Sequence, residues 1–230
     1  EYSHRGRICF HNTNRIGISL LFILEKIQMI KLYGTPRSRA SRVLWCLEEI
    51  GVAYENLDLK DVSDTEKENI LGKVNPNLKV PALDDNGFMV FESMAINLHL
   101  AKNYSQTLWP TDSNQQSAAI QWSIWAMTEI EPPFVELFLQ RIILPEEKRD
   151  PQAEETAIET INRPIGVLEN ILSKNDYVLG NTFTIADLNL VSIFTLNDIV
   201  KITMENFTRT EGWIEKCKAR PAYKKMASLR

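Results

Sequence analysis

The chain has 230 residues, of which 44% are hydrophobic, enough for one large domain or two small ones with well-filled cores. A formal net charge of −4 excludes the strongly basic surface that binds a nucleic acid backbone. The three cysteines, Cys9, Cys46 and Cys217, lie far apart without C-x-x-C spacing. This pattern argues against a zinc site, a dithiol redox centre or a disulfide scaffold, and it is typical of a reducing cytosol.

Residues 1–28 differ from the rest of the chain. They lack an initiating Met and contain a short apolar stretch, Ile16 to Leu24, after several arginines. The stretch is far shorter than the roughly 20 residues that span a bilayer, and no small-residue cleavage site follows it. We therefore expect no membrane insertion. We also expect residues 1–28 to be a non-native or disordered leader, with Met29 as the natural start.

The residues that follow predict alternating strands and helices. Strands are expected at 30–33 and 54–59, helices at 38–49, 65–71 and 93–103, and a hairpin at 82–83 and 88–91. Gly51 and Gly72 are expected to end the first two helices, the former as a left-handed cap. The run Asp84 to Gly87 favours the hairpin turn. The order βαβαββα is that of a thioredoxin-like domain, which we place at residues 29–105.

The second half of the chain predicts a different class of structure. Residues 106–114 are polar and contain a proline, as is typical of a linker, and residues 115–230 show no alternating strand pattern. We therefore expect an all-helical domain after an α/β one. The expected helices are 115 to about 143 with a kink at Pro132-Pro133, 152–173 with a disturbance at Pro164, one starting at a Thr184-Asp187 capping box, and 210–220 closing the bundle.

The run from Asn75 to Leu83 and the pair Glu92-Ser93 carry the clearest functional pattern. Val80 precedes Pro81, which has no N–H and cannot continue a ladder, so the backbone of Val80 can bind an extended ligand. Pro81 is expected to be cis. Ser93 falls at a helix start, where free N–H groups bind a carboxylate. Together these features predict a pocket for a small peptide in the first domain.

From Met29 to the C-terminus the chain resembles the cytosolic glutathione transferases, most of all the phi-like and bacterial members with an active-site serine. The resemblance is carried by stretches in the order and separations of the family: Leu32-Tyr33-Gly34, Arg42-Val43-Leu44, Leu47-Glu48-Glu49 and Phe183 to Leu188. It implies an enzyme that activates the glutathione thiol as a thiolate and conjugates it to hydrophobic electrophiles. It also implies a metal-free cytoplasmic homodimer that serves detoxification.

The resemblance further implies that Ser38 donates the hydrogen bond that stabilises the thiolate. Ser38 lies just ahead of the first helix and four residues before Arg42, a spacing similar to that of the delta class. The phi spacing differs by one residue, so Thr35 and Tyr33 remain alternatives. Ser38 could also be only an N-cap, a role that serine commonly fills.

The rest of the glutathione site follows from the same resemblance. Lys67 would bind the glycyl carboxylate, and Lys79 takes the place of a usual glutamine before Val80. Glu92 would bind the ammonium and Ser93 the carboxylate of the γ-glutamyl end. Each lysine could instead be an ordinary solvated charge, and the Glu-Ser pair a simple helix cap.

The resemblance leaves the electrophile and the balance of activities open. Glutathione-dependent peroxidase or disulfide reductase activity would use the same thiolate, and the fold also serves as a non-catalytic interaction module. Cys46 is expected to be a buried small hydrophobe and His99 a structural residue. Four residues of the first helix of the second domain are expected to be mostly core, with some bordering the electrophile pocket: Trp122, Trp125, Met127 and Phe134.

Overall fold

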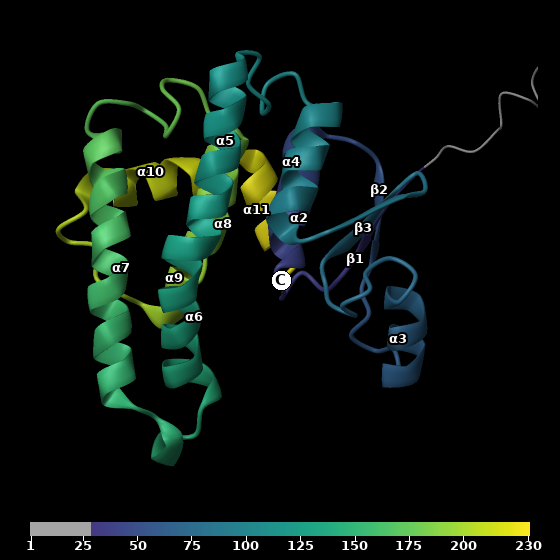
Figure 1. Ribbon diagram of the computed structural model, residues 1–230, viewed down its shortest axis with the longest axis horizontal. Helices are drawn as coiled ribbons and strands as arrows, with labels where there is room; N and C mark the ends of the chain where they lie inside the picture. Colours follow the sequence, from purple (N-terminus) through teal and green to yellow (C-terminus); the bar gives the residue numbers. More distant parts are fainter. Residues whose placement is uncertain (1–28) are drawn as a thin grey trace, which may run out of the picture.

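The computed structural model describes residues 29–230; the expected leader at residues 1–28 lies outside them. Figure 1 shows a small sheet with its helices on one side of the molecule and a wholly helical part on the other. The first part consists of β1 (Ile30–Tyr33), α2 (Ala40–Ile50), β2 (Tyr54–Leu57), α3 (Asp64–Leu71), β3 (Ala82–Asp85), β4 (Phe88–Phe91) and α4 (Ser93–Tyr104). The expected order βαβαββα is confirmed.

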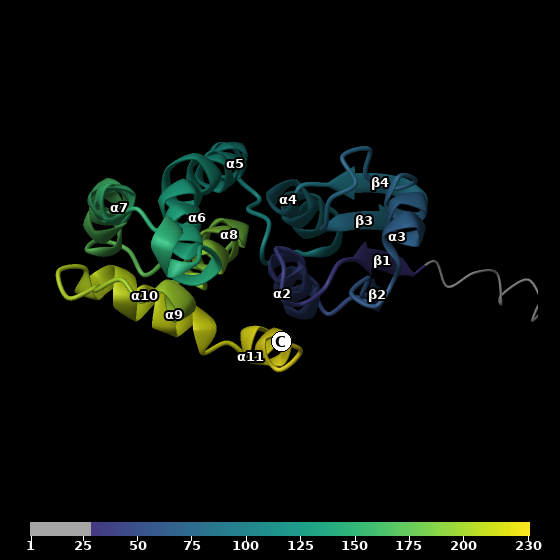
Figure 2. The same ribbon diagram turned by 90° about the horizontal axis from the view of Figure 1, so that it is seen from below.

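The sheet has four strands in the order β2-β1-β3-β4, with β1 parallel to β2 and antiparallel to β3. Figure 2 shows α2 and α4 on one face of this sheet and α3 on the other. Leu32 pairs with Leu83 and faces the large core under α2 and α4, whereas Tyr33 and Ala82 face the small core under α3. This two-faced sheet is the thioredoxin-like arrangement that the sequence predicts.

Several boundaries differ from the expected ones. Helix α2 begins at Ala40, so Ser38 lies in the loop before the helix; Gly51 ends it with a φ of 76°, as expected. The hairpin turn is the pair Asn86-Gly87, with φ values of 57° and 95°. A two-residue turn of this type needs a positive φ at each of its two residues. Asp84 and Asp85 therefore lie outside the turn, in β3, and pair with residues of β4.

The second part consists of helices only. They are α5 (Ser113–Trp125), the π-helical segment η1 (Ala126–Ile130), α6 (Glu131–Phe138), the π-helical segment η2 (Leu139–Ile143), the 3-10 turn η3 (Glu146–Lys148), α7 (Pro151–Leu172), α8 (Ile185–Phe194), α9 (Asn197–Val200), α10 (Thr208–Lys218) and α11 (Pro221–Ala227). Helix α8 is buried along its whole length, and the capping box of Thr184 and Asp187 at its start is confirmed. Among the described residues, none of the helices has the length and apolar character that crossing a bilayer requires.

The irregularity expected at Pro132-Pro133 occurs just ahead of them. The Glu131 N–H donates to the carbonyl of Ala126, five residues back, so the helix widens to a π turn before the two prolines, which have no N–H to donate. At Pro164, by contrast, α7 continues without interruption.

The expectation that a helix over 210–220 closes the bundle is wrong. That helix, α10, ends at Lys218, and Pro221 then starts another, α11, because proline is favoured in the first turn of a helix. Helix α11 lies against α2 of the first part (Figure 2), and Tyr223 meets the ring of Trp45 edge-on at 5.0 Å. The last helix therefore joins the two parts of the chain.

Candidate active site

The loop between β1 and α2 holds Ser38. The Ser38 Oγ accepts a hydrogen bond from the Ala40 N–H at 3.1 Å, and the hydroxyl donates to the carbonyl of Thr35 at 2.8 Å. The formal N-cap residue is Arg39, whose side chain makes no capping bond. Ser38 thus supports the first turn of α2 from just outside it while its side chain stays partly exposed.

Gly34 brings this loop against the segment that carries Val80. The Gly34 φ is 146°, and a Cβ there would lie 2.7 Å from the Cβ of Ala40. The same position is 3.3 Å from the Cβ of Val80 and 3.7 Å from the Ser38 Oγ. Only glycine allows so close an approach. The Cβ of Val80 and the Oγ of Ser38 therefore both lie close to Gly34.

The Val80-Pro81 peptide bond is cis, as the sequence predicts. Asn75 is buried and braces the loop ahead of it: its Nδ2 donates to the carbonyl of Lys79 at 2.7 Å. Lys79 itself is exposed, and Lys67 is half-buried on α3. Neither lysine forms an ion pair among residues 29–230.

Glu92 and Ser93 stand at the start of α4. Glu92 has a φ of 70° and makes no side-chain cap, so the first N–H groups of α4 keep their capacity to bind an acceptor. Ser93 is buried, and its Oγ lies 3.4 Å from Nη1 of Arg42. The pair therefore sits where the sequence places it, at an open helix start.

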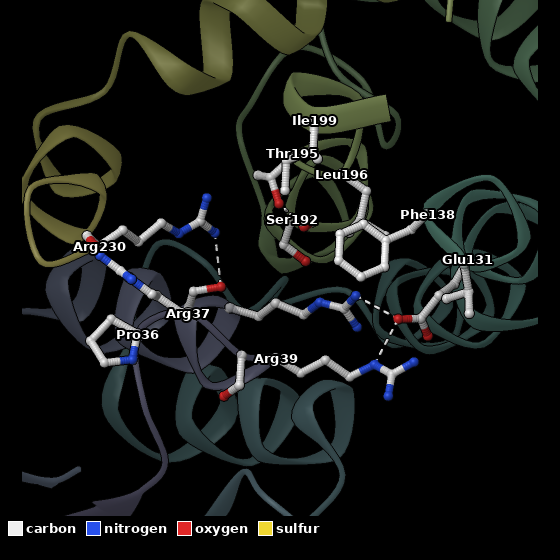
Figure 3. Close-up of a pocket in the computed structure, with 14 residues that line it drawn as sticks. Pro36, Arg37, Arg39, Glu131, Phe138, Ser192, Thr195, Leu196, Ile199 and Arg230 are labelled. Carbon is white, nitrogen blue, oxygen red and sulfur yellow. Dashed lines mark hydrogen bonds and ion pairs between the residues drawn. The ribbon is translucent and has the colours of Figure 1, made fainter. Parts of the chain in front are cut away.

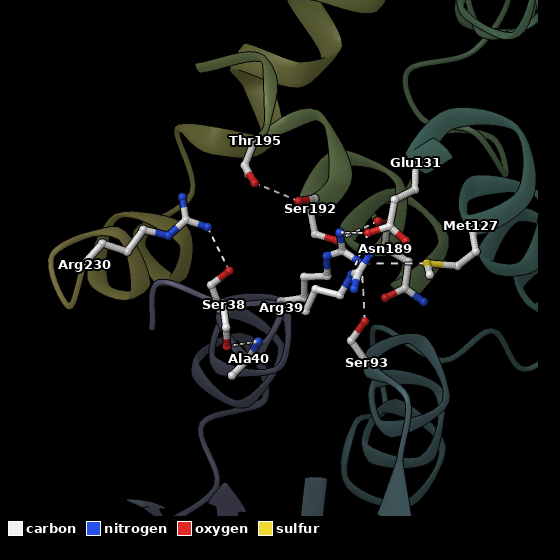
Figure 4. A network of polar contacts seen from close by, with 12 residues as sticks. Ser38, Arg39, Ala40, Ser93, Met127, Glu131, Asn189, Ser192, Thr195 and Arg230 are labelled. Atoms are coloured by element: carbon white, nitrogen blue, oxygen red, sulfur yellow. Dashed lines mark hydrogen bonds and ion pairs between the residues drawn. The ribbon is translucent and has the colours of Figure 1, made fainter. Parts of the chain in front are cut away.

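Sequence reasoning missed the ion pair between Arg42 of α2 and Glu131 of α6. Each residue is 4% exposed, and their closest atoms are 2.6 Å apart. Arg39 donates to the same carboxylate oxygen at 2.8 Å, and Figure 4 shows Ser93 and Met127 beside the same network. Burial alone would raise the pKa of Glu131, but the charges and hydrogen bonds of the two arginines outweigh it and hold that pKa below its ordinary value.

A cavity of about 480 Å³ opens between the two parts of the chain, and Ser38 lies in its wall. Its lining residues are Pro36, Arg37, Ser38, Arg39, Ser41, Arg42, Glu131, Val135, Phe138, Ser192, Thr195, Leu196, Ile199 and Arg230 (Figure 3). The volume lies within the range of small-molecule sites. Val80, Ser93 and the two lysines are not among the lining residues, so the expected peptide-binding residues lie outside this cavity.

The four residues expected on the first helix of the second domain do not line this cavity either. Phe134 is fully buried, and Val135 and Phe138 of the same helix take the lining positions. The π turn at η1 interrupts the regular α-helical period, so residues before η1 and residues after it no longer share a face at a spacing of about 3.6. The face that meets the cavity therefore could not be read from a period of 3.6.

The remaining sequence candidates lie away from the cavity wall. Tyr33 packs on the small core under α3, and burial raises its pKa. Cys46 is fully buried, and burial raises the pKa of its thiol. His99 pairs with Asp85 at 2.7 Å in the first part of the chain. Within residues 29–230, no group of three or more His, Cys, Asp or Glu side chains is placed to hold a metal ion.

Two family models match the chain. The glutathione S-transferase N-terminal domain matches residues 28–102, and the C-terminal domain of the same family matches residues 130–221. A glutathione S-transferase domain-containing protein of Dictyostelium discoideum is 31% identical over 84% of this chain and 78% of its own length. Glutathione S-transferase F13 of Arabidopsis thaliana is 28% identical over 86% of this chain and 94% of its own length.

A solved structure is similar over nearly the whole described chain. The theta class glutathione S-transferase of Xanthomonas axonopodis pv. citri, with glutathione bound, has a TM-score of 0.78 and 25% identity, and the match covers 86% of this chain and 97% of that one. Its fold therefore matches both the sheet-containing part and the helical part.

Proposed function

The chain belongs to the glutathione S-transferase family, and from this premise we propose that it binds glutathione, ionises its thiol and transfers the sulfur to an apolar electrophile. One observation carries the proposal: Ser38 lines a cavity of about 480 Å³, and Gly34 brings the Ser38 loop close to the segment that carries Val80. The family also supports a cytoplasmic homodimer with a role in detoxification, as parts of the same proposal.

Two features support a tripeptide site next to Ser38. The half-buried Val80 can offer its backbone N–H and C=O to an extended ligand, because Pro81 continues no strand pairing on that side. The start of α4 at Ser93 can bind the γ-glutamyl carboxylate through its free N–H groups. We assign the ammonium to Glu92, the glycyl carboxylate to Lys67, and a further contact with glutathione to Lys79, which precedes Val80.

The energy required of Ser38 is modest. For a thiol with a pKa near 8.5 to be mostly ionised at neutral pH, the site must lower that pKa by about two units, which corresponds to about 2.7 kcal/mol. A hydrogen bond to a charged acceptor contributes about 1.5–3 kcal/mol. A helix N-terminus adds up to about 2 kcal/mol in a partly buried geometry. One hydroxyl at the start of α2 is therefore sufficient.

The hydroxyl must change its partner to do this. It donates to the Thr35 carbonyl at 2.8 Å, and rotation about the Cβ–Oγ bond redirects the proton to a sulfur in the cavity. The Ala40 N–H, which donates to the same oxygen at 3.1 Å, remains in place during the rotation. That bond polarises the hydroxyl and makes it a better donor.

Tyr33 and Thr35 are less well placed than Ser38 to donate a hydrogen bond to a thiolate in the cavity. Tyr33 faces the small core under α3, and its raised pKa disfavours any role that needs an ionised phenol. The Thr35 Oγ1 accepts from the Arg37 N–H at 3.4 Å. Neither residue lines the cavity.

The test is the acidity of bound glutathione, titrated by the ultraviolet absorbance of its thiolate. In Ser38→Ala we expect the bound thiol pKa to rise by about one to two units, the equivalent of one lost hydrogen bond to an anion. Thr35→Val and Tyr33→Phe serve as matched controls that each remove one neighbouring hydroxyl and should leave the titration unchanged. An unchanged titration in Ser38→Ala, with a shift in either control, would transfer the role to that residue.

Binding itself separates an enzyme from an interaction module. Calorimetry of the full chain with glutathione should give a dissociation constant at or below the millimolar range. No heat of binding at millimolar glutathione would favour the non-catalytic reading and overturn the proposal.

A further inference from the structure

The cavity beside Ser38 is basic although the chain is acidic. Four arginines line it against one carboxylate, Glu131, a formal excess of three positive side-chain charges in a chain of net charge −4. Glu131 is shared by Arg39 and Arg42. The other two, Arg37 and Arg230, form no ion pair with any side chain of residues 29–230. No side-chain carboxylate of the described residues therefore neutralises their charge.

Each of these two arginine side chains uses one nitrogen in a hydrogen bond to the rest of the chain. The Arg37 Nε donates to the main-chain oxygen of Arg230 at 3.0 Å, and Nη2 of Arg230 donates to the Ser41 Oγ at 2.8 Å. Among the described residues, the Arg37 Nη1 and Nη2 atoms have no acceptor. A planar guanidinium with two free nitrogen atoms matches the two oxygens of a carboxylate.

The opposite side of the cavity carries apolar side chains next to the paired Glu131. Val135 and Phe138 come from α6, Leu196 lies between α8 and α9, and Ile199 comes from α9. Figure 3 shows Arg37 and Arg230 on one side of the cavity and Phe138 and Leu196 on the other. The two arginines that Glu131 does not pair thus lie across the cavity from these apolar side chains, an arrangement that fits a ligand with one acidic end.

We propose that the electrophile conjugated here is amphipathic: an anionic group binds Arg37 and Arg230, and an apolar body packs on Phe138 and Leu196. This inference rests on the proposed function and narrows its substrate class. Glutathione also has carboxylates, but the residues assigned to them, at Lys67 and at the start of α4, lie outside the cavity. The anion in the cavity therefore belongs to the second substrate.

The test compares two electrophiles of one skeleton, 4-chloro-3,5-dinitrobenzoate and its methyl ester. In both, the thiolate sulfur bonds to the ring carbon, and chloride leaves with the electron pair of the broken bond. Dividing each kcat/KM by the uncatalysed rate constant with glutathione removes the difference in reactivity. We expect the acid to be favoured about tenfold, the typical scale of a charge-assisted contact that is partly exposed to water.

Arg37→Gln should lower kcat/KM for the acid about tenfold and leave the ester within about twofold. Arg163→Gln is the matched control: Arg163 lies on α7 outside the cavity, its side chain is 82% exposed, and its loss changes the net charge equally. It should leave the acid-to-ester ratio unchanged. KM for glutathione should be the same in both variants.

The outcomes distinguish this inference from the proposed function. An equal loss for acid and ester in Arg37→Gln, or a raised KM for glutathione, would overturn the anionic substrate while leaving the transferase in place. If neither electrophile is turned over, the transferase proposal fails. Calorimetric binding of the acid and of the ester without glutathione then decides: tighter binding of the acid that needs Arg37 supports the inference, and equal affinities contradict it.

Discussion

The starts of α2 and α8 each lie beside a hydroxyl side chain, Ser38 and Thr184, and of these two residues only Ser38 lines the cavity. At the start of α8, Thr184 is buried, its Oγ1 accepts from the Ala186 N–H at 3.3 Å, and its own N–H donates to Asp187 at 2.9 Å. At the start of α2, Ser38 makes similar local bonds but is partly exposed in a cavity wall. Residue type alone does not separate a structural cap from a reactive group; access to a ligand does.

The carboxylates near the two helix starts differ in the same way. Asp187 accepts only from neutral donors, including the Val178 N–H at 2.9 Å and the Trp213 indole N–H at 3.1 Å. Glu131 accepts from two guanidinium groups and borders the cavity. The start of α8 is therefore held by hydrogen bonds and that of α2 by charge, and the two should respond differently to mutation and to pH.

The largest expected effect is that of Glu131→Gln. It leaves the buried Arg42 guanidinium without its carboxylate, which typically costs about 3–5 kcal/mol of the free energy of unfolding. Urea denaturation at pH 7 measures this loss. The double variant Arg42→Met/Glu131→Leu is the control, because removing both charges leaves no buried charge unpaired. A single variant as stable as the wild type would show that α2 is not held by this pair.

The second effect is that of Asp187→Ala, which leaves buried N–H groups of Val178, Thr184 and Trp213 without an acceptor. We expect a loss of about 2–4 kcal/mol in the same assay. Trp213→Phe, which removes one donor and keeps the carboxylate, should cost less. A loss below about 1 kcal/mol in Asp187→Ala would mean that these donors find water instead.

The pH dependence of these two losses should have opposite sign. The Glu131 pKa is lowered in the folded chain, so its contribution is complete above the unfolded value of about 4.3 and is lost as pH falls through the folded pKa. Burial raises the pKa of Asp187 despite its donors, so its contribution is present at low pH and falls as pH rises past about 3.9. As pH rises, the gap between wild type and variant widens for Glu131→Gln and narrows for Asp187→Ala.

What the sequence predicts well here are features with short-range causes. The left-handed Gly51, the cis bond before Pro81 and the box of Thr184 and Asp187 each depend on residues within a few positions of one another. The strands and most helices follow from apolar periodicity within single segments. These signals suffice for the thioredoxin-like order and for the helical class of the second half.

Most of the cavity wall has long-range causes, and apart from Ser38 the sequence does not point to its lining residues. Arg42 and Glu131 are 89 positions apart in the chain, and the neighbours of Glu131 do not distinguish it from a solvated acid. The available signal is Arg42, an arginine inside the apolar run of α2 that needs a buried partner of opposite charge. Helix α11 was missed although proline is favoured in a first helical turn, because the short segment after Pro221 is completed by its packing on α2, far away in the sequence.

The smallest expected effect on stability comes from removing the hydroxyl of Thr184 or of Ser38. These two variants also give the most direct test of the comparison between the two helix starts. Thr184→Ala should cost about 1 kcal/mol of unfolding free energy, the typical value of a lost cap, with the pKa of the bound glutathione thiol unchanged. Ser38→Ala should cost about 0.5 kcal/mol or less, because water can reach the Ala40 N–H when the hydroxyl is gone, yet it should raise that thiol pKa. Thr184→Ala should therefore lower stability without changing the thiol pKa, and Ser38→Ala should raise the thiol pKa with little loss of stability. If Ser38→Ala lost as much stability as Thr184→Ala and left the thiol unchanged, Ser38 would be a cap like Thr184, and the distinction drawn from the cavity would fail.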